Sequence, residues 1–289
     1  MRGFETIVLI RLSEKRGVKE FTNDTRIGII GAGKMGSALI SGLLRTGTVK
    51  TENLFASDVS SQRRCYVSKT YGIKCLANNK RVVANSDIVI IAVEPKHVRV
   101  VLEDIKEELT HQLLVSIAAG VSIGFLKRQL RQDLPIVRAM PNNPCIVGEG
   151  MIVIAPSPEV SKDRFETIKE VFASIGKVLV LNEKFFDAVT GLSGSGPAYI
   201  YLVIEGLIDG GMKSGLAEET ALILATQTVF GSGRMAIETK IHPSKLREMV
   251  TTPGGTTVEG LKELERSSVR AVFSKAVESA AKRSRELAS

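Results

Sequence analysis

Short runs of apolar residues in the first two thirds of the chain predict buried strands. The run Ile88–Val93 contains no polar residue, which is typical of a central strand covered on both faces. The predicted strands are Ile27–Ile30, Leu54–Ala56, Ile88–Val93, Leu113–Ile117, Ile136–Met140, Met151–Ile154 and Val178–Leu181. Amphipathic stretches between them predict the helices Met35–Arg45, Ser60–Tyr71, Val98–Glu108 and Lys162–Ile175. This alternation predicts an α/β fold with a mostly parallel, doubly wound sheet of the Rossmann type.

The pattern changes after Asn182, where helical periodicity replaces the strands. Pro197 fits the first turn of a long helix that runs to Ser214. Further helices are predicted over residues 217–239, 256–267 and 269 to the C-terminus. We therefore expect an N-terminal extension (residues 1–24), a dinucleotide-binding domain (25–182) and an all-helical domain (183–289).

Composition and charge narrow the class of protein. The chain is 44% hydrophobic and 24% charged, as is ordinary for a soluble globular protein. Its net charge of +8 comes from scattered basic residues with few aromatics, which favours attraction of anionic small molecules over nucleic-acid binding. No apolar run reaches the roughly 20 residues of a membrane span. The extension has the features of neither a signal peptide nor a transit peptide, so we expect a cytoplasmic protein.

The segment Gly31-Ala32-Gly33-Lys34-Met35-Gly36 is a G-x-G-x-x-G motif. It directly follows the first predicted strand and opens a helix, which is the context that dinucleotide binding requires. Gly31 allows the tight turn, Gly33 allows close approach of the pyrophosphate, and Gly36 allows the helix to pack on the strand. A plain strand-to-helix turn is the alternative interpretation.

The choice between NADH and NADPH depends on the end of the second strand. Asp58 stands where an acid usually binds the ribose hydroxyls and repels a 2′-phosphate, which favours NADH. Ser57, Asn79 and the pair Arg63-Arg64 favour NADPH, because they can donate to a phosphate. Asp58 also has a purely structural alternative, as the cap of the helix near Ser60. The sequence leaves the preference open.

Long motifs in both domains resemble one enzyme family. The segments are Ala92–Pro95, Ala118–Val121, Met140–Pro144, Asp187–Tyr199, Asp209–Leu216 and Thr252–Thr257. Together they closely resemble pyrroline-5-carboxylate reductase, the last enzyme of proline biosynthesis, and the resemblance extends from Thr25 to the end. It implies NAD(P)H-dependent reduction of a cyclic imine. It also implies an intertwined helical homodimer, or a higher homo-oligomer such as a decamer.

The motifs and the resemblance together imply site residues. Those implied for the cofactor are Ile30, Gly31, Ala32, Gly33, Lys34, Met35, Gly36, Ser57, Asp58, Asn79, Ala92, Val93, Glu94, Pro95, Ile117, Ala118, Ala119 and Glu183. Those implied for the substrate are Ser195, Gly255, Thr256 and Thr257. Of these, Thr257 is the expected catalytic residue, because its hydroxyl can hydrogen-bond the ring nitrogen.

Two positions depart from the family pattern. Glu94 stands where the family often has lysine, which reverses the charge beside the cofactor, and Met249 replaces a common asparagine. No metal site is expected, since the three cysteines form no C-x-x-C motif. A protonated imine is already an electrophile, so the reaction needs little acid–base machinery, and we assign no histidine to catalysis.

Two rival functions remain. A β-hydroxyacid dehydrogenase has a similar two-domain layout, but its catalytic lysine would fall at the position of Ile200. A dinucleotide-sensing protein that kept the fold without activity is the second rival.

Overall fold

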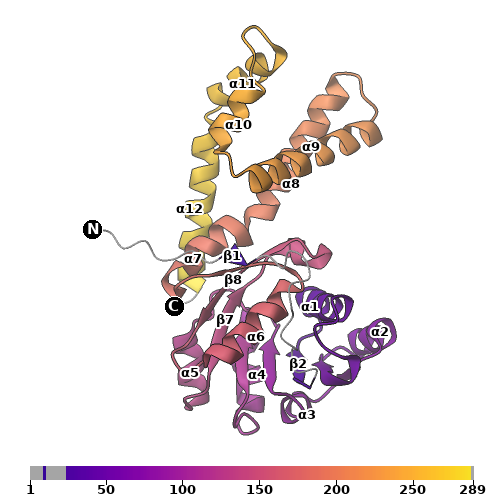
Figure 1. The fold of residues 1–289 in the computed structure, drawn as a ribbon, viewed down its shortest axis with the longest axis vertical. Coiled ribbons are helices and arrows are strands. Elements are labelled where there is room, and N and C mark those ends of the chain that lie inside the picture. Colours follow the sequence, from indigo (N-terminus) through magenta and orange to yellow (C-terminus); the bar gives the residue numbers. More distant parts are fainter. Residues whose placement is uncertain (1–8, 11–23, 288–289) are drawn as a thin grey trace, which may run out of the picture. The chain divides into compact units, whose positions relative to one another are not determined.

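The computed structural model describes residues 9–10 and 24–287 and divides the chain into two compact units (Figure 1). The first unit runs up to Gly194 and also includes the end of the chain from Ala280 onward. The second unit comprises Ser195–Ser279.

One sheet forms the centre of the first unit. Within the described residues it has nine strands in the order β1-β9-β8-β7-β6-β5-β2-β3-β4. The strands are β1 (Leu9–Ile10), β2 (Ile27–Ile30), β3 (Leu54–Ser57), β4 (Lys74–Leu76), β5 (Ile88–Ile91), β6 (Leu113–Ser116), β7 (Ile136–Met140), β8 (Gly150–Pro156) and β9 (Gly176–Val180). Only β8 against β7 and β1 against β9 are antiparallel. The predicted mostly parallel sheet is therefore confirmed.

Helices cover both faces of the sheet, which explains why β2 and β5 consist only of apolar residues and glycine. One apolar cluster joins Ile27 and Ile29 of β2 to α1 (Lys34–Arg45), α2 (Ser61–Tyr71) and α6 (Lys162–Ala173). The opposite cluster joins Ile30 to α3 (Asn79–Ala84), α4 (Pro95–Ile105) and α5 (Ile123–Leu130). Alternate residues of one strand thus enter opposite cores, as the period of two along a strand requires.

Some elements differ from the sequence prediction. The helix predicted to begin at Val98 begins at Pro95, because proline fits the first helical turn, where no N–H is needed. The short elements β4, α3 and α5 were not predicted. In β4, only three residues pair with β3, and Lys74 is exposed, so hydrophobic alternation gives little signal there. The strand β1 falls in the extension, whose structure the sequence did not predict.

The second unit is helical. It contains α8 (Gly196–Lys213), α9 (Glu218–Thr239), α10 (Pro243–Met249), α11 (Thr256–Arg266) and most of α12 (Val269–Leu287). In this unit α8 and α9 approach closely, since a Cβ added at Gly211 would lie 3.1 Å from the Ala221 Cβ. The structure assigns no strand to any residue of this unit, as the sequence predicted.

The segment after β9 still packs on the sheet. Phe186 and Val189 of α7 (Phe186–Val189) are buried with Met140, Val153 and Ala155. The first unit therefore continues through the π-helical turn η4 (Thr190–Gly194), beyond the boundary expected after Asn182.

The end of α12 also belongs to the first unit. The Ser284 hydroxyl donates to Asp187 Oδ1 at 2.7 Å, and both Ala281 and Ser284 are buried. This bond fastens the last helix to α7.

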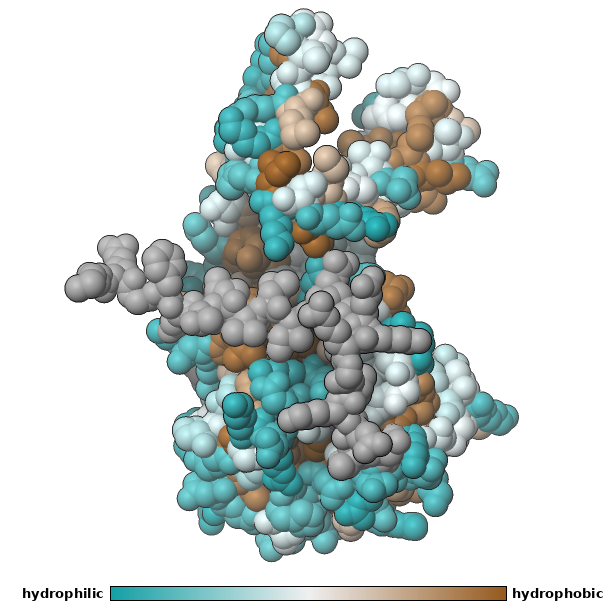
Figure 2. Space-filling model, viewed as in Figure 1, coloured by the Kyte–Doolittle hydropathy of each residue, from teal (hydrophilic) through white to brown (hydrophobic). Residues whose placement is uncertain are grey.

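Large apolar side chains lie exposed on the helical unit, and brown residues gather on its visible face (Figure 2). Leu202 is 67% exposed, Ile223 61% and Phe230 57%. Exposed apolar side chains that gather on one face are typical of an interaction surface. None of the helices in the described part of the chain is both long and apolar enough to span a membrane.

Candidate dinucleotide site

The glycine motif forms the loop between β2 and α1. Gly31 has φ +99°, and a Cβ there would lie 2.7 Å from the Ala92 carbonyl oxygen. Its N–H donates to the Ser57 carbonyl at 2.9 Å. A Cβ at Gly36 would overlap the Gly31 carbonyl oxygen, so these two positions require glycine for the backbone itself.

Gly33 differs, because a Cβ there would meet no atom within 4 Å apart from those of its neighbours along the chain. Gly33 is the N-cap of α1, and no side chain accepts a hydrogen bond from the first turn. Lys34 is exposed, and Met35 packs partly buried against the core. The uncapped N–H groups of this 12-residue helix and the open space at Gly33 fit a bound pyrophosphate.

Asp58 lies against the glycine loop. Its Oδ2 accepts the Ala32 N–H at 3.0 Å, and its Oδ1 accepts the Ser60 N–H at 2.8 Å. The cap of α2 is Ser60, whose Oγ accepts the Arg63 N–H at 3.3 Å. The interpretation of Asp58 as the helix cap is therefore wrong.

Ser57, the last residue of β3, is hydrogen-bonded to Asn79, the first residue of α3. The buried Ser57 hydroxyl donates to Asn79 Oδ1 at 2.8 Å, and Asn79 Nδ2 donates to Asp104 Oδ2 at 3.0 Å. The Ser57 proton is thus directed at Asn79 rather than outward. The structure brings the two predicted residues together as a polar chain.

The segments Ala92–Pro95 and Ile117–Ala119 follow the carboxyl ends of β5 and β6. The Ala92 N–H donates to the Ile30 carbonyl at 2.8 Å, and the Ile117 N–H donates to the Ile91 carbonyl at 3.1 Å. The loop ends of three parallel strands therefore meet at one edge of the sheet. In open α/β sheets this is the edge where ligands bind.

Glu94 forms an ion pair with a lysine two residues along the chain. Its carboxylate pairs with Lys96 Nζ at 2.8 Å on the surface. This hydrogen bond holds the pKa of Glu94 below its usual value. Lys96 therefore offsets the negative charge of Glu94 at the surface.

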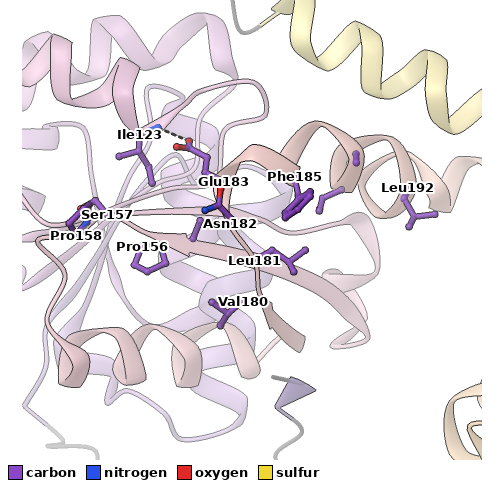
Figure 3. A pocket seen from close by; sticks show the side chains of 13 residues that line it. Ile123, Pro156, Ser157, Pro158, Val180, Leu181, Asn182, Glu183, Phe185 and Leu192 are labelled. Carbon is purple, nitrogen blue, oxygen red and sulfur yellow. Dashed lines mark hydrogen bonds between the residues drawn. The ribbon is translucent and has the colours of Figure 1, made fainter. Parts of the chain in front are cut away.

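The Glu183 carboxylate accepts hydrogen bonds from a backbone N–H and from an arginine of the first unit. Its Oε1 accepts the Ile123 N–H at 2.8 Å (Figure 3). The same oxygen accepts a hydrogen bond from Arg138 Nη1 at 3.1 Å. Arg138 is 5% exposed, and its guanidinium lies 4.6 Å from the centre of the Phe186 ring.

Glu183 also lines a mostly apolar cavity of about 900 Å³. Its remaining lining residues are Ile123, Ala155, Pro156, Ser157, Pro158, Val180, Leu181, Asn182, Phe185, Ala188, Val189 and Leu192.

Sequence reasoning assigned no role to Arg138 or Ser37. Arg138 had a usable signal, because it is the only charged residue in the predicted strand Ile136–Met140, and a buried charge requires a partner. Ser37 gave no such signal. It is buried in α1, where its Oγ donates to the Ala32 carbonyl at 3.1 Å.

The expected substrate residues belong to the second unit. Gly254 has φ +72°, and Gly255 is the N-cap of α11 without a side-chain cap. The Gly255 N–H already donates to the Thr252 carbonyl at 2.9 Å, so it is occupied within the protein, and the N–H groups of Thr256 and Thr257 begin the first turn of α11. Thr256 and Thr257 open α11 with exposed side chains.

Ser195 begins the second unit as the N-cap of α8. Among the described residues, no group of three or more His, Cys, Asp or Glu side chains is arranged to hold a metal ion.

Comparisons with known proteins assign the family. A family model described as pyrroline-5-carboxylate reductase dimerisation matches residues 183–287, and one described as NADP oxidoreductase, coenzyme F420-dependent, matches residues 26–120. A pyrroline-5-carboxylate reductase of Methanosarcina acetivorans is 43% identical over 263 residues, which cover 91% of this chain and 97% of the relative. One of Arabidopsis thaliana is 42% identical over 263 residues, with 91% and 95% covered.

Solved structures agree. A Plasmodium falciparum pyrroline carboxylate reductase with NADP bound has a TM-score of 0.85 at 35% identity, covering 92% of this chain and 99% of that one. A Coxiella burnetii pyrroline-5-carboxylate reductase has a TM-score of 0.86 at 33% identity, with 92% and 99% covered. This chain is thus a member of the pyrroline-5-carboxylate reductase family.

Proposed function

We propose that this protein reduces 1-pyrroline-5-carboxylate to L-proline with NADH or NADPH as the hydride donor. The observation that carries the proposal is the match of both domains, at 43% identity, to a relative named for this activity. The local geometry supports it, because Gly31 and Gly36 are required by the backbone while Gly33 leaves space for a ligand. The rival assignment as a β-hydroxyacid dehydrogenase lacks its lysine, since Ile200 occupies that position.

The cofactor supplies a hydride, and the protein supplies orientation and electrostatics. The hydride adds to the carbon of the protonated C=N bond, whose π electrons become the nitrogen lone pair of proline. The nitrogen keeps the proton that it carried. No side chain has to remove a proton in this step, which fits a site without an assigned histidine.

In this proposal the glycine loop, Ile30 to Gly36, binds the pyrophosphate through the N-terminus of α1. Ser57, Asp58 and Asn79 lie at the adenosine end, and Ala92–Pro95 with Ile117–Ala119 lie at the nicotinamide end. Glu183 supports this end through its bond to the Ile123 N–H at the start of α5.

The substrate carboxylate is proposed to bind the N–H groups at the start of α11, near Gly255 and Thr256, with Ser195 nearby in the site. The Thr257 hydroxyl is proposed to bond the ring nitrogen. In well-oriented reactions, positioning of this kind can lower the barrier by about 7–11 kcal/mol.

The activity is tested by mixing purified protein with 1-pyrroline-5-carboxylate and either reduced cofactor. We expect the absorbance of NADH or NADPH to fall and proline to form. If neither cofactor is consumed, the proposed function is wrong.

Thr257→Ala tests the substrate role. We expect lower turnover with nearly unchanged dinucleotide affinity, because the change removes a hydroxyl on the substrate side alone. The matched control is Thr239→Ala, whose hydroxyl donates to the Met235 carbonyl within its own helix at 2.7 Å. A loss of cofactor affinity in Thr257→Ala would reject the role given to Thr257.

The assembly is proposed to be a homodimer or a larger homo-oligomer. The dimerisation family model covers residues 183–287, and the helical unit exposes large apolar side chains such as Leu202, Ile223 and Phe230. Light scattering on the purified protein tests this, and a monomer at micromolar concentration would contradict it.

A further inference from the structure

Both backbone polar groups of Ala32, in the middle of the glycine loop, are held by side chains. The N–H donates to Asp58 Oδ2 at 3.0 Å. The carbonyl accepts Arg63 Nε at 3.1 Å, and it also accepts Arg63 Nη2 and the Ser37 hydroxyl. Arg63 Nη2 in turn donates to Ser37 Oγ at 2.7 Å. Asp58 and Arg63 thus form a clamp on Ala32, which is fully buried between Gly31 and Gly33.

The clamp directs Arg63 at the loop itself. Its Nε and Nη2 bond the Ala32 carbonyl, and its guanidinium lies 5.0 Å from the centre of the Tyr66 ring. Arg64 is likewise directed at the backbone, since its Nη1 donates to the carbonyls of Asp58 and Val59 at 2.9 Å each. Both arginines that could bind a 2′-phosphate therefore donate to carbonyl groups of the protein.

The carboxylate of Asp58 accepts hydrogen bonds from backbone N–H groups in the same region. The N–H groups of Ala32 and Ser60 hold its two oxygens at the carboxyl end of β3, next to the glycine loop. An acid at this point of a Rossmann domain accepts hydrogen bonds from the adenosine ribose, and its charge repels a 2′-phosphate.

We infer that this protein selects NADH over NADPH through Asp58, and that Arg63 is a positioning residue for the glycine loop rather than a ligand of the 2′-phosphate. The inference rests on the proposed function only in taking a nicotinamide dinucleotide as the hydride donor. It separates two roles that the sequence left open: Asp58 sets the cofactor preference, and Arg63 sets the affinity for either cofactor.

The test measures binding of NADH and NADPH by their fluorescence, without substrate, in the wild type and in variants. We expect the wild type to bind NADH about tenfold or more tightly than NADPH, which corresponds to about 1.4 kcal/mol. Asp58→Asn keeps an oxygen for the Ala32 N–H and removes the charge, while its amide nitrogen replaces the oxygen that accepts the Ser60 N–H. Its affinity ratio should shift about tenfold or more toward NADPH.

Arg63→Met should weaken both cofactors by the same factor and leave their ratio unchanged, because the loop loses its support whatever the ribose carries. Arg63→Lys, which keeps one donor for the Ala32 carbonyl, should recover part of the affinity for both. Lys69→Gln is the matched control. It removes a positive charge from an exposed position of the same helix and should change neither affinity nor ratio. Circular dichroism verifies that each variant is folded.

Three results would overturn the inference. The first is tighter binding of NADPH than of NADH by the wild type. The second is an unchanged affinity ratio in Asp58→Asn. The third is a loss confined to NADPH in Arg63→Met, which would make Arg63 a phosphate ligand. Because binding is measured without 1-pyrroline-5-carboxylate, failure of the proposed reaction leaves this result readable, and the two failures are distinguishable.

Discussion

The bonds of Glu183 lead to a prediction that separates support of the fold from contact with the cofactor. Glu183→Gln keeps the side-chain oxygen that accepts the Ile123 N–H but removes the charge facing Arg138. We expect the variant to be less stable and to keep the wild-type KM for the cofactor. The variant should be less stable because Arg138 stays buried in β7 without its counter-charge. The KM should not change because both bonds of Glu183 Oε1 are to the protein.

The magnitude follows from the exposure of the two side chains. Removing one partner of a fully buried ion pair costs about 3–5 kcal/mol. Here the Arg138 side chain is 7% exposed, but the Glu183 side chain is 30% exposed, so water screens part of the interaction. We therefore expect a loss of about 1–3 kcal/mol, and a melting temperature lower by about 4–8 °C at the middle of that range.

Thermal unfolding followed by circular dichroism, together with cofactor kinetics, provides the assay. Glu103→Gln is the control, because its ion pair with Lys106 lies on the surface and should contribute less than about 1 kcal/mol. The double variant Glu183→Gln/Arg138→Met should lose less than the sum of the single variants, because it leaves no unpaired buried charge.

Two outcomes would refute this reasoning. An unchanged melting temperature would mean that Arg138 does not depend on Glu183. A higher KM for the cofactor at unchanged stability would mean that Glu183 contacts the dinucleotide, as the family resemblance alone implies.

Two further predictions concern the glycine loop and acid stability. Gly36→Ala should lower both the melting temperature and dinucleotide affinity, because its Cβ overlaps the Gly31 carbonyl; Gly33→Ala, with no protein atom nearby, should lower affinity alone. Equal melting temperatures for the two variants would contradict this. The hydrogen bond from Lys127 lowers the pKa of Glu159 from 4.5 to about 2. The ionised Glu159 should therefore stabilise the fold fully above pH 4.5, and this contribution should vanish as the pH falls toward 2 and the carboxylate is protonated. The melting temperatures of wild type and Glu159→Gln should differ at pH 6 and converge at pH 2, and a constant difference would refute it.

The architecture was readable from hydrophobic periodicity, because the central strands are buried on both faces. Ile27–Ile30 and Ile136–Met140 were predicted with the bounds that the structure shows. Periodicity failed where an element is short or partly exposed, as in β4 and α3. It also gave no warning that α7 packs on the sheet, because four residues are too few for a helical pattern.

The sequence predicted which residues belong to the candidate site, but it did not predict their hydrogen-bond partners. The sequence placed Asp58 and Arg63 near the glycine loop, yet it could not distinguish a cap, a ribose ligand and a phosphate ligand. That distinction depends on which backbone group each side chain reaches across 26 or 31 residues of sequence. The partner of Glu183 was missed for the same reason, since Arg138 lies 45 residues away.

The hydrogen bond between Ser284 and Asp187 has a consequence for folding during synthesis, because its two partners are translated far apart in time. Asp187 leaves the ribosome 97 residues before its partner, and the whole helical unit is translated between them. The sheet and its helices can form early, but Asp187 lacks its hydrogen bond from Ser284 until translation has passed that residue. A nascent chain stalled before Ala280 should therefore remain more accessible to proteases around α7 than the released protein.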